Sequence, residues 1–183
     1  MTIKQIVGNT TDDLWQQIST DLSGKDVFEY NVLLVQNGKK VELMIDIDLG
    51  GGFESGSEST SFTALISPEH DFRFALHHKG LIDSVGKFLG MEDVVIGYPE
   101  FDEAIIIKTN DKERVHGIFS DANVRETFMS IGSFTLCLTH HHEMGQKGSQ
   151  PFLELSMDKG ITDPTELRRL YEAFYKVLCA LDA

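Results

Sequence analysis

The sequence has little of what several classes of protein require. Its 183 residues include only two cysteines, Cys137 and Cys179, which are too few for a disulfide framework and favour a reducing compartment. It has no apolar run of about 18 residues that could span a bilayer, and its first residues lack the apolar core of a signal peptide. These absences predict a cytoplasmic chain without membrane insertion.

Basic residues are also scarce, because 16 Lys and Arg stand against 29 Asp and Glu, for a formal net charge of −13. A nucleic-acid partner is therefore not expected, since such binding depends on a basic surface that displaces counterions from phosphates. Residues 41–72 contain seven of the acids and no Lys or Arg. This tract predicts an acidic surface for a basic partner. Its Asp46-x-Asp48 spacing does not fit a calcium-binding EF-hand.

The common catalytic motifs are missing too. The sequence contains no Gly-x-Ser-x-Gly, His-Glu-x-x-His or Gly-x-Gly-x-x-Gly pattern. Cys137 stands between two leucines in an apolar alternation, which is typical of a core residue rather than a nucleophile. The motifs therefore point to no reaction.

What is present is a clear hydrophobic pattern. A length of 183 residues with 41% apolar residues is sufficient for a single domain covering 1–183. The pattern predicts an α+β fold, with a mostly antiparallel sheet, helices packed on one face of it, and a long C-terminal helix. The acidic, Gly/Ser-rich segment 50–60 is expected to be a surface loop within this domain, and the alternative is a linker that makes residues 1–60 a separate subdomain. Strands are predicted at 28–34, 41–49, 60–67, 72–78, 93–96, 101–108, 134–138 and 152–157, and helices at 11–24, 81–89, 111–119, 120–129 and 164–181.

Histidines form the most conspicuous chemical cluster. His140 and His142 share one side of an extended chain, and with Glu143 they could hold zinc or iron. His77 ends another predicted strand and would be a third ligand if the two strand ends meet. The alternative interpretation is a polar strand end that runs into an exposed loop. Apart from such a metal, no cofactor is expected.

A second cluster is the phrase Gly97-Tyr98-Pro99-Glu100-Phe101-Asp102. One interpretation is structural: Gly97 allows a bend, Phe101 anchors the turn in the core, and Asp102 accepts hydrogen bonds from loop amides. The other is ligand binding by Tyr98, Glu100 and Asp102.

Residues 72–182 around this phrase resemble a module of uncharacterised bacterial proteins. The match lies in Gly97, Glu100, Phe101 and Asp102, which form a Gly-x-x-Glu-Phe-Asp phrase followed by a strand, a polar turn and a helix. The resemblance implies no activity and leaves the acidic N-terminal third unmatched.

These observations favour a non-catalytic cytoplasmic bacterial domain that binds a protein or a small ligand. A metal-dependent hydrolase built on His140 and His142 is one alternative, and a self-associating structural module is another. The sequence specifies neither a substrate nor an oligomeric state.

Overall fold

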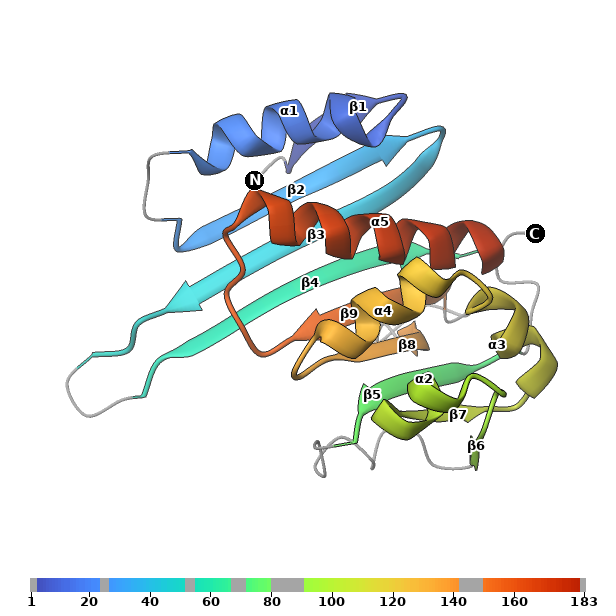
Figure 1. Ribbon diagram of the computed structural model, residues 1–183. Helices are drawn as coiled ribbons and strands as arrows, with labels where there is room; N and C mark the ends of the chain where they lie inside the picture. Colours follow the sequence, from blue (N-terminus) through green and yellow to red (C-terminus); the bar gives the residue numbers. More distant parts are fainter. Residues whose placement is uncertain are drawn as a thin grey trace. The chain divides into compact units, whose positions relative to one another are not determined.

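The computed structural model describes residues 3–23, 27–51, 55–66, 72–79, 91–141 and 150–181. Its fold is α+β, with a mostly antiparallel sheet of nine strands and a long C-terminal helix, which confirms the predicted fold class (Figure 1). Contacts divide the chain into two compact units. The first unit comprises Met1–Ala64 and Ser156–Glu172, and the second comprises Leu65–Leu155 and Ala173–Ala183. That the whole chain forms a single domain stays a prediction.

The strands and helices follow one another in an order close to the predicted one. In chain order they are β1 (Lys4–Gly8), α1 (Thr11–Leu22), β2 (Glu29–Gln36), β3 (Lys39–Asp48), β4 (Ser57–Leu65), β5 (Phe74–His78), β6 (Glu92–Val94), α2 (Pro99–Ala104), β7 (Ile105–Thr109), α3 (Lys112–Ile118), α4 (Ala122–Ser130), β8 (Thr135–His141), β9 (Gln150–Met157) and α5 (Pro164–Leu181).

In the first unit the strand order is β1-β2-β3-β4. The β2–β3 hairpin turns at Asn37 and Gly38, whose φ angles of 49° and 81° confirm the predicted tight turn. β1 pairs parallel to β2, with Ile6 beside Leu34. Sequence periodicity missed β1, because a strand of five residues with a single buried side chain carries almost no alternation.

Helix α1 and the first turns of α5 cover one face of this sheet (Figure 1). The Trp15 ring lies 5.0 Å from the ring of Tyr171, which in turn lies 6.3 Å from Phe62 of β4. The Tyr171 hydroxyl donates a 2.9 Å hydrogen bond to the Gln36 side chain of β2. The apolar side chains that alternate along β2 and β3 therefore have helices above them on this face.

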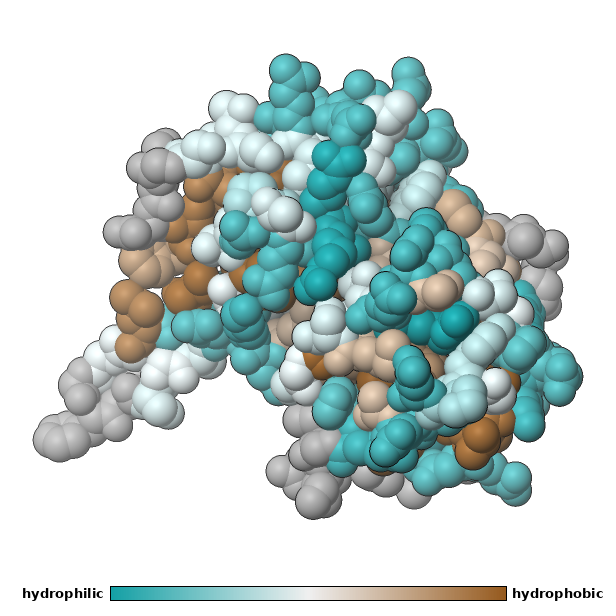
Figure 2. Space-filling view, viewed as in Figure 1, coloured by the Kyte–Doolittle hydropathy of each residue, from teal (hydrophilic) through white to brown (hydrophobic). Residues whose placement is uncertain are grey.

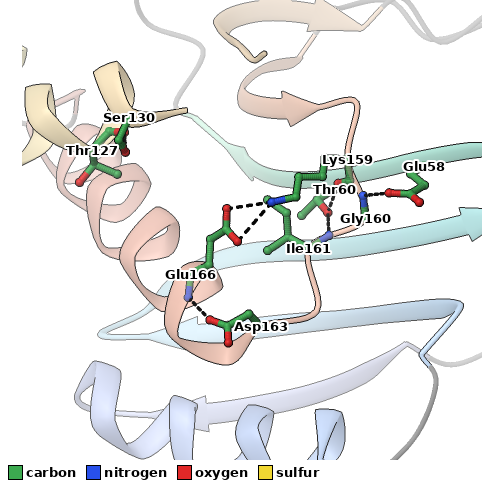
Figure 3. Close-up of polar contacts among 9 residues, drawn as sticks. All are labelled: Glu58, Thr60, Thr127, Ser130, Lys159, Gly160, Ile161, Asp163 and Glu166. Carbon is green, nitrogen blue, oxygen red and sulfur yellow. Dashed lines mark hydrogen bonds and ion pairs between the residues drawn. The ribbon is translucent and has the colours of Figure 1, made fainter. Parts of the chain in front are cut away.

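The segment that leads into α5 is held to β4 (Figure 3). The Thr60 hydroxyl donates to the Lys159 carbonyl at 2.7 Å and accepts from the Ile161 amide at 2.9 Å. The Gly160 amide donates to Glu58 at 3.0 Å. Residues 57–59, which the composition predicted as loop, belong to strand β4. The pairing with β3 and the bond to Gly160 satisfy polar groups that the composition suggested were in contact with water.

In the second unit the strand order is β9-β8-β5-β7-β6. A chain of aromatic rings packs its helices onto one face of this sheet. The Phe119 ring lies 6.4 Å from Phe74 of β5, 5.4 Å from Phe101 of α2 and 6.0 Å from Phe128 of α4. Phe128 continues the chain to Phe134, at 5.4 Å. All five rings are almost completely buried.

The strand predicted over 101–108 is wrong in its first half. Residues Pro99–Ala104 form helix α2, and the strand begins only at Ile105. Pro99 occupies the first position of this helix, where its fixed φ and missing N–H suit a helix start. Phe101 faces the core from the first turn. The helix predicted at 81–89 lies outside the described residues.

Candidate functional site

The first unit has a sheet face that no described helix covers. Side chains alternate along β3, so Val41, Leu43 and Ile45 are fully buried beneath the helices and the residues between them point to the opposite side. We call this opposite side the open face. Its residues are Gln5 and Val7 of β1, Glu29, Asn31, Leu33 and Val35 of β2, Lys40, Glu42, Met44, Asp46 and Asp48 of β3, and Ser57, Ser59, Ser61 and Thr63 of β4.

The open face carries apolar side chains on three neighbouring strands. Val7 is 61% exposed and lies beside Val35, while Met44 is 41% exposed and lies opposite Asn31. Leu33 lies one alternation from Val35 on the same side of β2, and both are half-buried. A solvated face of an antiparallel sheet usually carries polar residues at such positions. This concentration of apolar side chains therefore marks the surface as a candidate binding site.

Carboxylates border these apolar residues. Glu42 lies opposite Leu33, and Glu29 lies directly opposite Asp46. Asp48 continues the row at the end of β3. Within the described ranges, none of these four carboxylates has an ion-pair partner, and Lys40 is the one cation among the residues of this face. The open face is therefore both apolar and acidic.

The structure separates members of the acidic tract that the sequence had grouped. Glu42, Asp46 and Asp48 lie on the open face, whereas Glu58 pairs with Ile47 on the helix-covered side and accepts from the Gly160 amide. The other three acids of the tract lie outside the described residues. The Glu58 carboxylate therefore holds the chain that leads to α5 and is not part of the open face.

A smaller apolar surface lies on the helix-covered side of the first unit. Figure 2 shows it as a brown area where β2 begins and β3 ends. Phe28 is 47% exposed there and its carbonyl accepts from the Ile47 amide, while Leu49 is 70% exposed. By the alternation of β2 and β3, both side chains are on the helix-covered side. They lie beyond the ends of the two strands, past the residues that are fully buried.

A groove between α1 and the start of α5 has a cavity volume of about 370 Å³, within the range of small-ligand pockets. Its charged side chains and its indole N–H already have partners. The Trp15 indole N–H donates to the Pro164 carbonyl at 2.6 Å, and the Arg168 guanidinium binds Asp12 at 2.6 Å and Glu172 at 2.8 Å. The hydrogen bond to Glu172, and to a smaller extent the one to Asp12, raises the pKa of Arg168. The groups of the groove that could bind a ligand most strongly are therefore engaged within the first unit.

The Gly97 phrase forms a turn closed by its own carboxylate. Both oxygens of Asp102 accept 2.9 Å hydrogen bonds, one from the Ile96 amide and one from the Gly97 amide. Gly97 has a φ of +97°, a conformation that disfavours other residues. These bonds confirm the structural role predicted for Asp102.

The Tyr98 ring lies between two side chains of the second unit. It stacks on His116 with ring centres 4.7 Å apart, and the Arg125 guanidinium lies 3.8 Å from its centre on a cation–π contact. Glu100, two residues further along the chain, is exposed. Ligand binding by Tyr98, Glu100 and Asp102 stays a prediction. Of these three side chains, only the exposed Glu100 makes no hydrogen bond within the described part of the chain.

The histidines of the metal prediction do not all come together. His77 is fully buried on β5, opposite Thr135 of β8. His140 lies five residues further along β8, about 17 Å away at the rise of a strand. His142 and Glu143 lie outside the described residues. Within the residues that the structure does describe, no group of three or more His, Cys, Asp or Glu side chains could hold a metal ion.

No family model matches this sequence, and no curated protein matches it. Among solved structures, the chain is similar to the crystal structure of the mycobacterial trehalose monomycolate transport factor A, TtfA, with a TM-score of 0.51 and 10% sequence identity. The match covers 86% of this chain and 74% of the other. At this identity the likeness shows a shared fold.

None of the helices in the described ranges is both long enough and apolar enough to cross a membrane.

Proposed function

We propose that this protein is a non-catalytic binding module that recognises another protein through the open face of its first unit. One observation carries the proposal: four apolar side chains, at Val7, Leu33, Val35 and Met44, occupy a sheet face on which alternation alone would place polar residues. A partner that covers them would remove apolar surface from water, at roughly 25 cal/mol per Å².

Two further facts support this proposal. The carboxylates at the border of the apolar residues give the surface the polar rim that is usual in protein interfaces. The similar solved structure is named a transport factor, a name that fits a binding role for the shared fold.

The test is photo-crosslinking in the source cells, with a photoreactive benzoylphenylalanine in place of Met44. The matched control carries the same group in place of Val95, a 64% exposed residue of the second unit. We expect a discrete crosslinked protein from position 44 that position 95 does not give, and that Val7→Asp removes. The same products from both positions, or none from position 44, would overturn the proposal.

A metal-dependent hydrolase on His140 and His142 makes a different prediction. Protein purified without an affinity tag would then contain stoichiometric zinc or iron, and the double variant His140→Ala/His142→Ala would lose it. On the binding proposal, elemental analysis gives the same low metal content for the native protein and this variant. A stoichiometric metal that depends on the two histidines would favour the hydrolase.

A further inference from the structure

We infer that the partner of the open face is a basic amphipathic helix, with apolar side chains on Val7, Leu33, Val35 and Met44 and with Lys or Arg beside the carboxylates of β2 and β3. This inference rests on the proposed function and specifies its partner. It follows from the register of the strands, the charges and the backbone hydrogen bonding of the sheet.

Two like charges face each other on the open face. Glu29 and Asp46 lie directly opposite each other on an antiparallel pair, where like charges are destabilising. Neither carboxylate has an ion-pair partner within the described ranges. A Lys or Arg placed over this pair would relieve the repulsion between the two carboxylates. This local effect favours a cationic partner at this position, in addition to the attraction from the net negative charge of the chain.

The open face also contains a hydrogen-bond acceptor without a partner among the described residues. Asn31 lies on the open face opposite Met44, and its side-chain oxygen is buried without a hydrogen-bond partner in the described part of the chain. A buried acceptor without a partner costs about 1–3 kcal/mol. A partner that displaces the side chains over this oxygen and places a Lys or Arg there would supply the missing donor.

The hydrogen bonding of the sheet decides the conformation of the partner. A sheet face presents side chains, because the backbone groups of the inner strands β2 and β3 already bond to their neighbours. A segment that docks on it must satisfy its own backbone hydrogen bonds, as a helix does. The eight residues of β2 span about 26 Å, close to the length of an 18-residue helix.

Charge also decides against a second copy of this chain. If the open faces of two copies met, the four carboxylates and one lysine of one copy would lie against the four carboxylates and one lysine of the other. Such like-charge contacts oppose association. A basic partner makes the same surface electrostatically complementary.

The test measures binding of a defined probe to the full chain. The probe is a fluorescent 18-residue helical peptide with Leu along one face and Lys on both flanks, and fluorescence anisotropy gives the Kd. The first variant is Glu42→Lys/Asp46→Lys on the open face. The matched control, Glu103→Lys/Glu126→Lys, makes the same charge change at two exposed positions of the second unit.

We expect the open-face double variant to weaken binding about tenfold and the control less than twofold, because close charge pairs act over a Debye length of about 10 Å. Met44→Ser is expected to weaken binding about threefold without a change in its salt dependence. Equal weakening by both double variants would mean attraction to the net charge alone and would overturn the inference, as would a peptide with Glu in place of Lys that binds equally well.

The two proposals can fail separately. If position 44 crosslinks a discrete protein while the Lys-rich peptide does not distinguish the variants, the face binds a partner of other chemistry and only the helix inference fails. If position 44 crosslinks nothing specific, the proposed function fails. A dimer in light scattering that Met44→Ser disrupts would instead identify a second copy as the occupant and would overturn the inference.

Discussion

Strands β3 and β5 show how differently the two units use their sheets. In β3, buried residues alternate with exposed or half-buried ones, so helices cover one side and the other side is open. In β5, Phe74, Ala75, Leu76 and His77 are all fully buried, so both sides of the strand are covered. The second unit thus uses both faces of its central strand for packing, whereas in the first unit one face of β3 stays exposed or half-buried.

The largest expected effect is in the aromatic chain of the second unit. Phe119→Ala removes a fully buried ring that contacts three others, and we expect it to lower the free energy of unfolding by about 3–5 kcal/mol. Met44→Ala on the open face should cost about 1 kcal/mol or less, because 41% of that residue is already exposed. Urea unfolding measures both. Equal losses would mean that the open face is as tightly packed as the core.

The next effect concerns the chain that enters α5. A Cβ at Gly160 would lie 2.3 Å from Cγ1 of Ile47, so Gly160→Ala should cost about 1–3 kcal/mol through overpacking. The control is Gly51→Ala, where a Cβ meets nothing within 4 Å. Thermal unfolding compares the two variants. An unchanged Tm for Gly160→Ala would show that Ile47 shifts aside freely.

A smaller effect separates the two interpretations of the Gly97 phrase. Asp102→Asn replaces one of the two acceptors that hold the Ile96 and Gly97 amides, and we expect a loss of about 1–2 kcal/mol in stability. Glu100→Gln should leave stability within about 0.5 kcal/mol, because this side chain is exposed. If Asp102→Asn unfolds at the same denaturant concentration as the native chain, the carboxylate does not stabilise the turn.

The smallest effect is a pH dependence in the first unit. Burial raises the pKa of Asp21, but hydrogen bonds from Lys4 and Tyr30 outweigh burial and leave it below its usual value. A carboxyl group whose pKa is lower in the folded protein stabilises the fold at pH values above its pKa in the unfolded chain, which is about 3.9. This stabilisation is lost as the pH falls through the pKa of the group in the folded protein. The stability gap between native protein and Asp21→Asn, about 1 kcal/mol at neutral pH, should therefore close below about pH 4.

The matched variant for this experiment is Tyr30→Phe, which removes one of the two donors to Asp21. In the Tyr30→Phe background, the difference in stability between the protein with Asp21 and its Asp21→Asn variant at neutral pH should be smaller, because one hydrogen bond to the carboxylate is gone. A gap that is constant from pH 3 to pH 7 would show that Asp21 has no lowered pKa in the folded protein.

Much of the fold could be predicted from local patterns. Asn37-Gly38 specified the hairpin turn because few other pairs tolerate positive φ at both positions, and Asp163-Pro164 specified the start of α5. Residues 101–104 could not be assigned in this way. An apolar and acidic run of that length fits a strand or a helix, and the start at Pro99 and the packing of Phe101 decided for the helix.

The candidate site was predicted only in part. The acidic tract was visible as a charge imbalance, yet its members separated in space, since Asp46 lies on the open face and Glu58 holds Gly160. The apolar half of the surface had only a weak sequence signal, the unbroken apolar run Val32-Leu33-Leu34-Val35, because Val7 and Met44 belong to two other strands. His77 and His140 looked equivalent as strand ends until the register placed them apart.

The sequence by itself determined the α+β class, the hairpin, the terminal helix and the strong negative charge, because each depends on neighbouring residues or on composition. Only the tertiary structure decided which face of each strand is covered, and therefore which side chains meet on the open face. The physical reason is that alternation places side chains on two sides of a strand but does not say which side receives a helix. That choice depends on contacts such as Trp15 with Tyr171, between residues far apart in the chain.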